Sequence, residues 1–297
     1  MSTSSQILQY TFSGLTLGAI YAIIALGFTI IYNATDIVNF AQGEFVMLGA
    51  LTMVTLHSPP PAGHGLALWL ALPLAVATGA AVAGALQRLA IRPLRHGSVL
   101  TLIIVTIAAS ILLRGAAMIL WGRNAMLLPP FTQRGALFVG QASIMPQSLW
   151  VIGVTALVVV GLAIFYARTL VGKGMRAVAI NRQGAQLVGI SPSRMVLWSF
   201  VLSGALGAVA GILIAPITMA VYNMGTLLGL KGFSAAILGG LGSSPGAVLG
   251  GVILGLLESF AGGFISSGYK DAVAFLILLA VLFIRPTGML GGRTTPS

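Results

Sequence analysis

The sequence predicts an all-α polytopic membrane protein, with about eight to nine transmembrane or re-entrant helices and an inverted repeat. Hydrophobic residues make up 58% of the 297 residues and charged residues only 6%, against about 25% charged in a typical soluble protein. So few polar side chains could not cover the surface of a soluble fold. The composition therefore excludes soluble enzymes, disordered tails and disulfide scaffolds. The absence of cysteine also excludes thiolate nucleophiles and cysteine-ligated metals.

Six uninterrupted apolar stretches are long enough to cross a bilayer, which takes about 20 residues per helix. They cover roughly residues 7–32, 66–87, 98–121, 148–167, 193–216 and 271–285. Two further stretches are interrupted. Residues 36–56 carry several polar side chains, and residues 225–263 are broken by Lys231 and by the Ser-Ser-Pro-Gly run at 243–246. We expect the second of these to cross twice, with its turn on the cytoplasmic side.

The basic residues predict the orientation of the chain, because short loops rich in Lys and Arg stay cytoplasmic. Ten of the fifteen bases fall in three segments: Arg88, Arg92 and Arg95; Arg168, Lys173, Arg176, Arg182 and Arg194; Arg285 and Arg293. Counting crossings between these segments places the N-terminus and the loop near 122–147 outside and the C-terminus in the cytoplasm. The net charge of +11 is therefore a topological signal, and we expect no binding of nucleic acid.

An internal repeat is indicated when the chain is compared with itself at a shift of 190 positions. Eight identities appear, among them Ser13-Gly14 with Ser203-Gly204 and Tyr32-Asn33 with Tyr222-Asn223. The two copies would enter the membrane from opposite sides, which is the inverted arrangement of many transporters. The interrupted segments 33–50 and 223–240 would then be equivalent. Irregular backbone at membrane depth is tolerated where it lines a cavity, so paired interruptions point to a substrate pathway.

Few polar groups are available inside the predicted membrane, and four of them are candidates for the substrate pathway: Asn39, Gln42, Glu44 and Lys231. A charge in hydrocarbon is costly and should face a cavity or a partner. Alternatives stay open for both charged groups. Glu44 could lie at the cytoplasmic interface near a helix N-terminus, or hold a broken helix together. Lys231 could snorkel to the outer surface, point into a cavity, or pair with an acid of the other half.

The remaining titratable residues are expected at the membrane surface. Glu258, Lys270 and Asp271 flank a short predicted outer turn, where we expect interface residues. The three histidines, His57, His64 and His96, lack the spacing of metal ligands. We therefore expect no metal site and no catalytic residue.

The cytoplasmic loop at about 168–193 carries a helical pattern. Its small and apolar residues recur at spacings of three and four on one face: Ala177, Ile180, Gly184, Leu187 and Val188. Gly189 is suited to end this helix, and Ser191-Pro192 to begin the next membrane span. The helix could lie on the lipid surface or insert into a groove on a cytoplasmic partner.

Several motifs resemble one known family. They are the run Gly14–Ala22, the cluster Asn39–Glu44 followed by Phe45, the loop Arg176–Ser191 and the tail Arg285–Gly288. Together they are similar to the LivH-type permease of branched-chain amino acid ABC transporters, and the resemblance covers the whole chain. One departure is visible, because the family often has His where this chain has Gln42. That exchange removes a titratable group from the cluster.

The resemblance implies a single transmembrane permease domain over residues 1–297, located in the bacterial inner membrane. It implies four kinds of contact: a homologous second permease, two cytoplasmic ATPases, an extracytoplasmic substrate-binding protein and the lipid bilayer. The loop 168–193 would be the coupling element that contacts an ATPase and responds to its conformational change. Its coupling residues would be Arg176, Ala177, Ile180, Arg182, Gly184, Leu187 and Gly189. The chain would need no cofactor of its own, since ATP would be bound by the partner subunits.

The expected function is transport of branched-chain or related hydrophobic amino acids, driven by ATP hydrolysis on partner subunits. The chain contains no Gly-rich phosphate loop ending in Gly-Lys-Ser or Gly-Lys-Thr, so we expect it to be a non-catalytic subunit. Permeases for urea and short-chain amides share the motifs and form one alternative. An ion-coupled secondary transporter is a second. An intramembrane enzyme is disfavoured, because no paired carboxylates or Ser-His arrangement lies at membrane depth.

Overall fold

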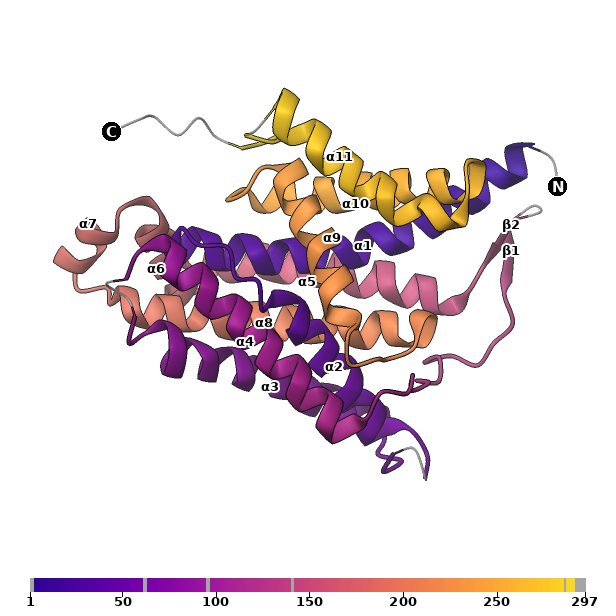
Figure 1. Ribbon diagram of the computed structural model, residues 1–297, viewed down its shortest axis with the longest axis horizontal. Coiled ribbons are helices and arrows are strands. Elements are labelled where there is room, and N and C mark those ends of the chain that lie inside the picture. The colour runs from indigo at the N-terminus through magenta and orange to yellow at the C-terminus, as the bar shows by residue number, and fades with distance from the viewer. Residues whose placement is uncertain (1–2, 61–62, 95–96, 140–141, 286, 292–297) are drawn as a thin grey trace.

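The protein is a helical bundle in the computed structural model, which describes residues 3–60, 63–94, 97–139, 142–285 and 287–291 (Figure 1). The first half contains α1 (Thr3–Thr35), α2 (Gln42–His57), α3 (Leu68–Leu86) with its π-helical extension η1 (Gln87–Ile91), α4 (Val99–Trp121) and α5 (Pro146–Arg168). The second half contains α6 (Leu170–Ile180), α7 (Arg182–Leu187), α8 (Pro192–Thr218), α9 (Met224–Gly239), α10 (Ser244–Phe264), the 3-10 turn η2 (Ser267–Tyr269) and α11 (Lys270–Ile284). The predicted all-α polytopic class is confirmed.

A short antiparallel ladder is the exception to the helical pattern among the described residues. Strands β1 (Leu137–Val139) and β2 (Ala142–Ile144) pair Leu137 with Ile144 and Phe138 with Ser143. The backbone N–H of Ser143 also donates to Oε1 of Gln9, 2.8 Å away, which ties the ladder to the start of α1.

Six of the described helices are long and apolar enough to cross a membrane: α1, α3 with η1, α4, α5, α8 and α10. Five of them match predicted stretches, and the sixth, α10, comes from the interrupted stretch 225–263. The predicted span 271–285 is α11, which has only 15 residues. Helices α2 and α9, of 16 residues each, are also shorter than these six. Sixteen residues rise about 24 Å, less than the roughly 30 Å of a hydrocarbon core.

The break between α9 and α10 lies slightly earlier than predicted. Gly240 and Gly242 have φ of +100° and +94°, so the turn occupies residues 240–243. Ser243 caps the next helix, because its hydroxyl accepts the N–H of Gly246 at 3.2 Å. Ser244 and Pro245 already lie in the first turn of α10.

The two halves of the bundle are arranged as a repeat around α1 and α8, which run in opposite directions (Figure 1). Each long helix is followed by a short one, and each is covered by a glycine-bearing partner: α10 packs on α1, and α3 packs on α8. Each long helix is followed directly by a non-glycine residue with positive φ, Asp36 at 57° and Met219 at 64°. The predicted shift of 190 is wrong by eight residues, since α9 begins and ends 182 residues after α2 (Gln42 to Met224, His57 to Gly239).

Helices α2 and α9 come into backbone contact at glycines, and this contact depends on the missing side chains. A Cβ on Gly43 would overlap the carbonyl oxygen of Gly225, and a Cβ on Gly225 would overlap that of Gly43. These two glycines are also 182 residues apart. The contact therefore lies between equivalent positions of the two halves.

The two ends of the bundle differ in charge. Helices α6 and α7 lie at one end, together with the end of α11, while the β1–β2 ladder and the start of α1 lie at the other (Figure 1). Most of the bases grouped in the sequence fall near α6 and α7, at the ends of η1, α5 and α11 and the start of α8. The ladder end holds Arg123, Arg134 and Lys270.

Candidate functional site

A cavity of about 150 Å³ lies where α1, α2, α4 and α9 come together. Three aromatic rings line one part of it, with Phe233 lying 5.7 Å from Phe28 and 5.8 Å from Phe40 between ring centroids. Glu44, Ser110 and Thr226 supply the polar lining. The cavity thus combines an aromatic wall with one carboxylate and two hydroxyl groups.

Glu44 is the charged residue of this cavity, and it is 1% exposed in the first turns of α2. Its Oε1 accepts a hydrogen bond from the Ser110 hydroxyl at 2.8 Å and lies 3.7 Å from Nε of Arg114. Among the described residues, its Oε2 has no hydrogen-bond partner, and neither has the buried hydroxyl of Thr226 on the facing helix. Buried polar groups are normally satisfied, so this pair of open positions marks a place where a ligand or water could bind.

Arg114 is a functional candidate that the sequence analysis missed. It lies within α4, whose stretch was treated as uninterrupted, and its side chain is 31% exposed. An ionisable residue within a membrane helix is itself a signal of function, and that signal was present at position 114. Ser110, one turn earlier, and Thr226 gave no comparable signal, because hydroxyl residues are common in membrane helices.

Asn39 and Gln42 lie beside Glu44 in sequence but do not line this cavity. The Asn39 Oδ1 accepts the N–H of Ala41 at 3.1 Å, which shapes the turn before α2. Gln42 bonds through its amide to the carbonyl oxygen of Ser203 at 3.2 Å, and the Ser203 hydroxyl contacts both Gln42 and the carbonyl of Gly27. Gln42 therefore joins α2 to the crossing of α1 and α8.

Lys231 forms a separate charged cluster on the other side of α9. Its Nζ lies 2.7 Å from Oε1 of Glu258 and 2.6 Å from Oδ1 of Asp271. Tyr21 donates its hydroxyl to the second oxygen of Glu258 at 2.8 Å, and Nζ lies 5.7 Å from the centre of the Tyr21 ring. The acids that pair with Lys231 come from its own half, not from the other half as one alternative held.

The expectation that Glu258 lies at the outer interface is wrong. It was placed at the outer interface because Lys270 and Asp271 follow shortly in sequence, but it is 1% exposed in the middle of α10. Helix α10 continues for six residues beyond it, to Phe264. Asp271, whose side chain is 44% exposed, does lie near the surface.

The loop 168–193 forms two helices instead of the single helix predicted. The helix stops at Ile180 because Asn181 adopts an extended backbone, and its Oδ1 then caps α7 by accepting the N–H of Gly184 at 2.8 Å. Gly189, with φ of +83°, ends α7 as predicted, and Pro192 begins α8. Ala177 and Ile180 therefore lie on a different helix from Gly184 and Leu187.

The exposed surface of this pair of helices is strongly apolar. Leu170, Ile180, Leu187 and Val188 are between 75% and 89% exposed, while Met175, Val178 and Ala185 are buried toward the bundle. Arg176 donates to the backbone carbonyl of Tyr166 at the end of α5, and Arg182 is exposed on α7. Large apolar side chains this exposed on a basic end of the bundle form a surface suited to a partner.

No three His, Asp or Glu side chains come together in the described part of the chain.

The chain is similar to known proteins over most of its length. A family model described as "Branched-chain amino acid transport system / permease component" matches residues 10–282. The chain is 37% identical to the high-affinity branched-chain amino acid transport system permease protein BraD of Pseudomonas aeruginosa, over 96% of this chain and 95% of that protein. It is 36% identical to the permease protein LivH of Escherichia coli (strain K12), with the same coverage. It is 28% identical to the ribose import permease protein RbsC of Escherichia coli, over 89% of this chain and 82% of that protein.

Proposed function

This chain belongs to the family of branched-chain amino acid transport system permease components, and from that premise we propose that it carries branched-chain amino acids across the membrane in an ATP-driven importer. The observation that carries the proposal is the match over residues 10–282. Relatives named for branched-chain amino acids reach 36–37% identity, against 28% for a ribose permease. This difference favours branched-chain amino acids over a sugar as the substrate.

The assembly we propose contains four further subunits: a homologous permease, two cytoplasmic ATPases and an extracytoplasmic substrate-binding protein. The sequence has no phosphate loop for ATP, so hydrolysis would occur on the ATPases and this subunit would be non-catalytic and free of cofactors. The apolar surface of α6 and α7 supports docking of an ATPase there. Its Ile180 and Leu187 side chains are 87% and 89% exposed, and burying them against a groove would be favourable.

The proposed orientation places α6 and α7 in the cytoplasm of a bacterium, in the inner membrane. The N-terminus would be outside and the C-terminus inside, since α1 starts at the end opposite α6 and α7 (Figure 1). The clustering of bases at the α6–α7 end supports this orientation.

For the substrate pathway, we propose that Glu44 and its cavity lie on it, with Asn39 and Gln42 holding the surrounding backbone. A branched aliphatic side chain fits against Phe28, Phe40 and Phe233, and the ammonium of an amino acid fits the unpartnered Oε2 of Glu44. A passing substrate needs weak sites, because tight binding slows release. Lys231 supports the pathway indirectly, by holding α9 against α10 and α11.

The test is uptake by the full importer reconstituted in vesicles with its ATPases and binding protein. We expect uptake of leucine, isoleucine and valine that requires ATP on the ATPase side and persists when an ionophore collapses ion gradients. Uptake without ATP that the ionophore abolishes would instead support a secondary transporter. Uptake of urea or acetamide in place of the amino acids would support the amide alternative.

A further inference from the structure

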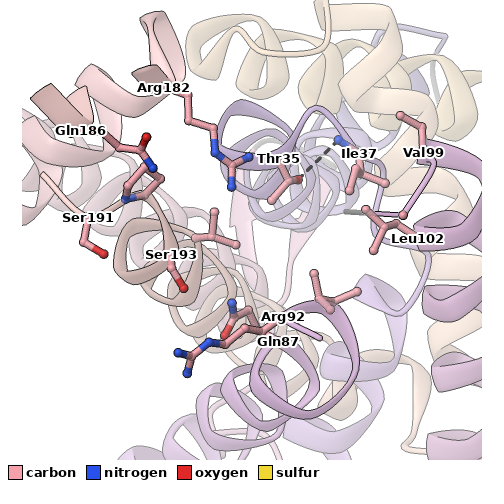
Figure 2. Close-up of a pocket in the computed structure, with 14 residues that line it drawn as sticks. Thr35, Ile37, Gln87, Arg92, Val99, Leu102, Arg182, Gln186, Ser191 and Ser193 are labelled. Carbon is pink, nitrogen blue, oxygen red and sulfur yellow. Dashed lines mark hydrogen bonds between the residues drawn. The ribbon is translucent and has the colours of Figure 1, made fainter. Parts of the chain in front are cut away.

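A second cavity, of about 380 Å³, lies at the α6–α7 end of the bundle (Figure 2). Its walls come from the end of α1, from η1, from the first turns of α4 and α8, and from α7. Figure 2 shows Arg182 reaching from α7 toward Thr35, with Arg92 and Gln87 on the opposite side of the cavity. Neither Glu44 nor Lys231 lines it, so it is distinct from both charged clusters described above.

The cavity has two positive charges and no counter-charge from the described residues. Arg92 and Arg182 line it, and neither forms an ion pair within the part of the chain that the structure describes. The chain has only four acids. Three of them pair elsewhere, and Asp36, which follows Thr35, does not line the cavity. An anion from outside the chain is therefore the natural partner for these two guanidinium groups.

Neutral donors add to the positive charge. Gln87 lines the cavity at 3% exposure, and its side-chain amide has no hydrogen-bond partner among the described residues. The 27-residue helix α8 begins at the same cavity, and the side chain of its N-cap Ser191 makes no capping hydrogen bond among the described residues. Free N–H groups at a helix N-terminus favour an anion. The side chain of Gln87 is the independent sign that a polar ligand fits here, because it lines the cavity from a residue that is otherwise buried and has no hydrogen bond among the described residues.

The rest of the lining is apolar and leads onto the outer face of the bundle. Ile37, Ile91, Leu102 and Val196 are buried around the cavity, and Val99 lines it at 56% exposure. From Val99 the exposed apolar surface continues along α4 through Leu100 at 67% and Ile104 at 57%. This surface faces the hydrocarbon of the bilayer if α4 spans the membrane. A free anion would have no use for such a surface, whereas an acyl chain would lie along it.

We propose that this cavity binds the phosphate headgroup of an acidic phospholipid, with Arg92, Arg182 and Gln87 on the phosphate and the acyl chains along α4. Basic pockets between helix ends at the cytoplasmic surface are suited to such headgroups. The site needs only a chain that spans a membrane, so it does not depend on which substrate the importer carries.

The test uses the purified full-length chain and measures lipid binding directly. Native mass spectrometry and thermal unfolding are recorded with phosphatidylglycerol, with phosphatidylcholine, and with inorganic phosphate. The site variant is Arg92→Gln with Arg182→Gln. The matched control is Arg123→Gln with Arg134→Gln, which removes the same charge at the opposite end of the bundle. Gln87→Leu is a third variant that removes the amide and keeps the charge.

We expect phosphatidylglycerol to bind and to raise the Tm of the unmodified chain and of the control, while phosphatidylcholine and inorganic phosphate do neither. Binding to the site variant should be weaker by about tenfold or more, since each arginine near a membrane surface adds about 1 kcal/mol for an acidic lipid. Gln87→Leu should weaken it by a smaller factor. Equal binding to site and control variants would overturn the proposal. So would equal protection by inorganic phosphate, which would identify a free anion as the ligand.

Discussion

The short helices α2 and α9 occupy corresponding places in the two halves, but their charged residues are paired in different ways. Glu44 on α2 has one hydrogen bond, a 3.7 Å contact with Arg114, and an oxygen left open beside a cavity. Lys231 on α9 has two carboxylate oxygens within 2.7 Å and the ring of Tyr21 nearby. A partly satisfied charge can exchange ligands, whereas a fully neutralised one holds helices together. The two equivalent helices thus hold their charged residues in two different environments.

The difference follows from what packs on each short helix. Helix α9 lies against α10 and α11, each of which supplies an acid. Helix α2 lies against α4, which supplies Ser110 and the partly exposed Arg114. A carboxylate that faces one partly exposed cation at 3.7 Å keeps more freedom than an ammonium enclosed by two acids.

The largest expected effect comes from breaking the enclosed cluster. Lys231→Met leaves Glu258, which is 1% exposed, with only the hydroxyl of Tyr21 as a partner. Removing one member of a buried ion pair costs about 3–5 kcal/mol. We expect a marked loss of thermal stability and of folded protein in detergent, measured as Tm and as the monodisperse fraction on gel filtration.

Lys270→Met provides the control for that variant, since Lys270 is an exposed lysine at the start of α11 without an ion pair in the described residues. It should leave Tm close to that of the unmodified chain. An equal loss for both variants would show that the buried cluster contributes no special stability.

The contact between α2 and α9 provides the next test. In Gly43→Ala the new methyl group meets the backbone of Gly225, which no side-chain rotation can relieve. We expect a loss of about 1–3 kcal/mol in stability. Gly115→Ala on α4, where a Cβ would meet nothing within 4 Å, should be neutral or slightly stabilising. If Gly43→Ala were as stable as Gly115→Ala, the two short helices would not be in close contact.

A charge placed on the α6–α7 surface is expected to change stability little but to reduce the coupling of transport to the ATPase strongly. Leu187→Asp places a charge on a side chain that is 89% exposed, so stability should change by less than about 0.5 kcal/mol. ATPase capture and ATP-driven uptake should both fall. Gln183→Asp adds the same charge on an exposed residue of α7 without removing an apolar group. Equal ATPase capture by the two variants would instead support the alternative that α6 and α7 lie on the lipid surface.

The sequence predicted the membrane class, most of the long helices and the turn before α10, because apolar runs and Gly-Ser-Pro signals are local features. It misplaced the repeat by eight residues. Apolar sequence gives chance identities at many shifts, so the shift with matching residues differs from the shift that aligns the ends of α2 and α9. It also missed the pairing of Lys231 with Glu258, which are 27 residues apart and meet only because α9 and α10 fold back on each other. Glu44 was identified as a candidate, but its partners depend on packing of α4 that no local pattern encodes.

The most direct test of the contrast between α2 and α9 is uptake per assembled complex after equivalent carboxylate-to-amide changes in the two clusters. Glu44→Gln removes the charge at the cavity, and Asp271→Asn removes one at the Lys231 cluster, where Glu258 still pairs with the lysine. We predict that Glu44→Gln lowers ATP-driven leucine uptake per complex by about tenfold, the effect of losing one charged interaction, with Tm nearly unchanged. Asp271→Asn should lower Tm and leave uptake per complex intact. Full uptake per complex in Glu44→Gln would contradict the assignment of Glu44 to the pathway.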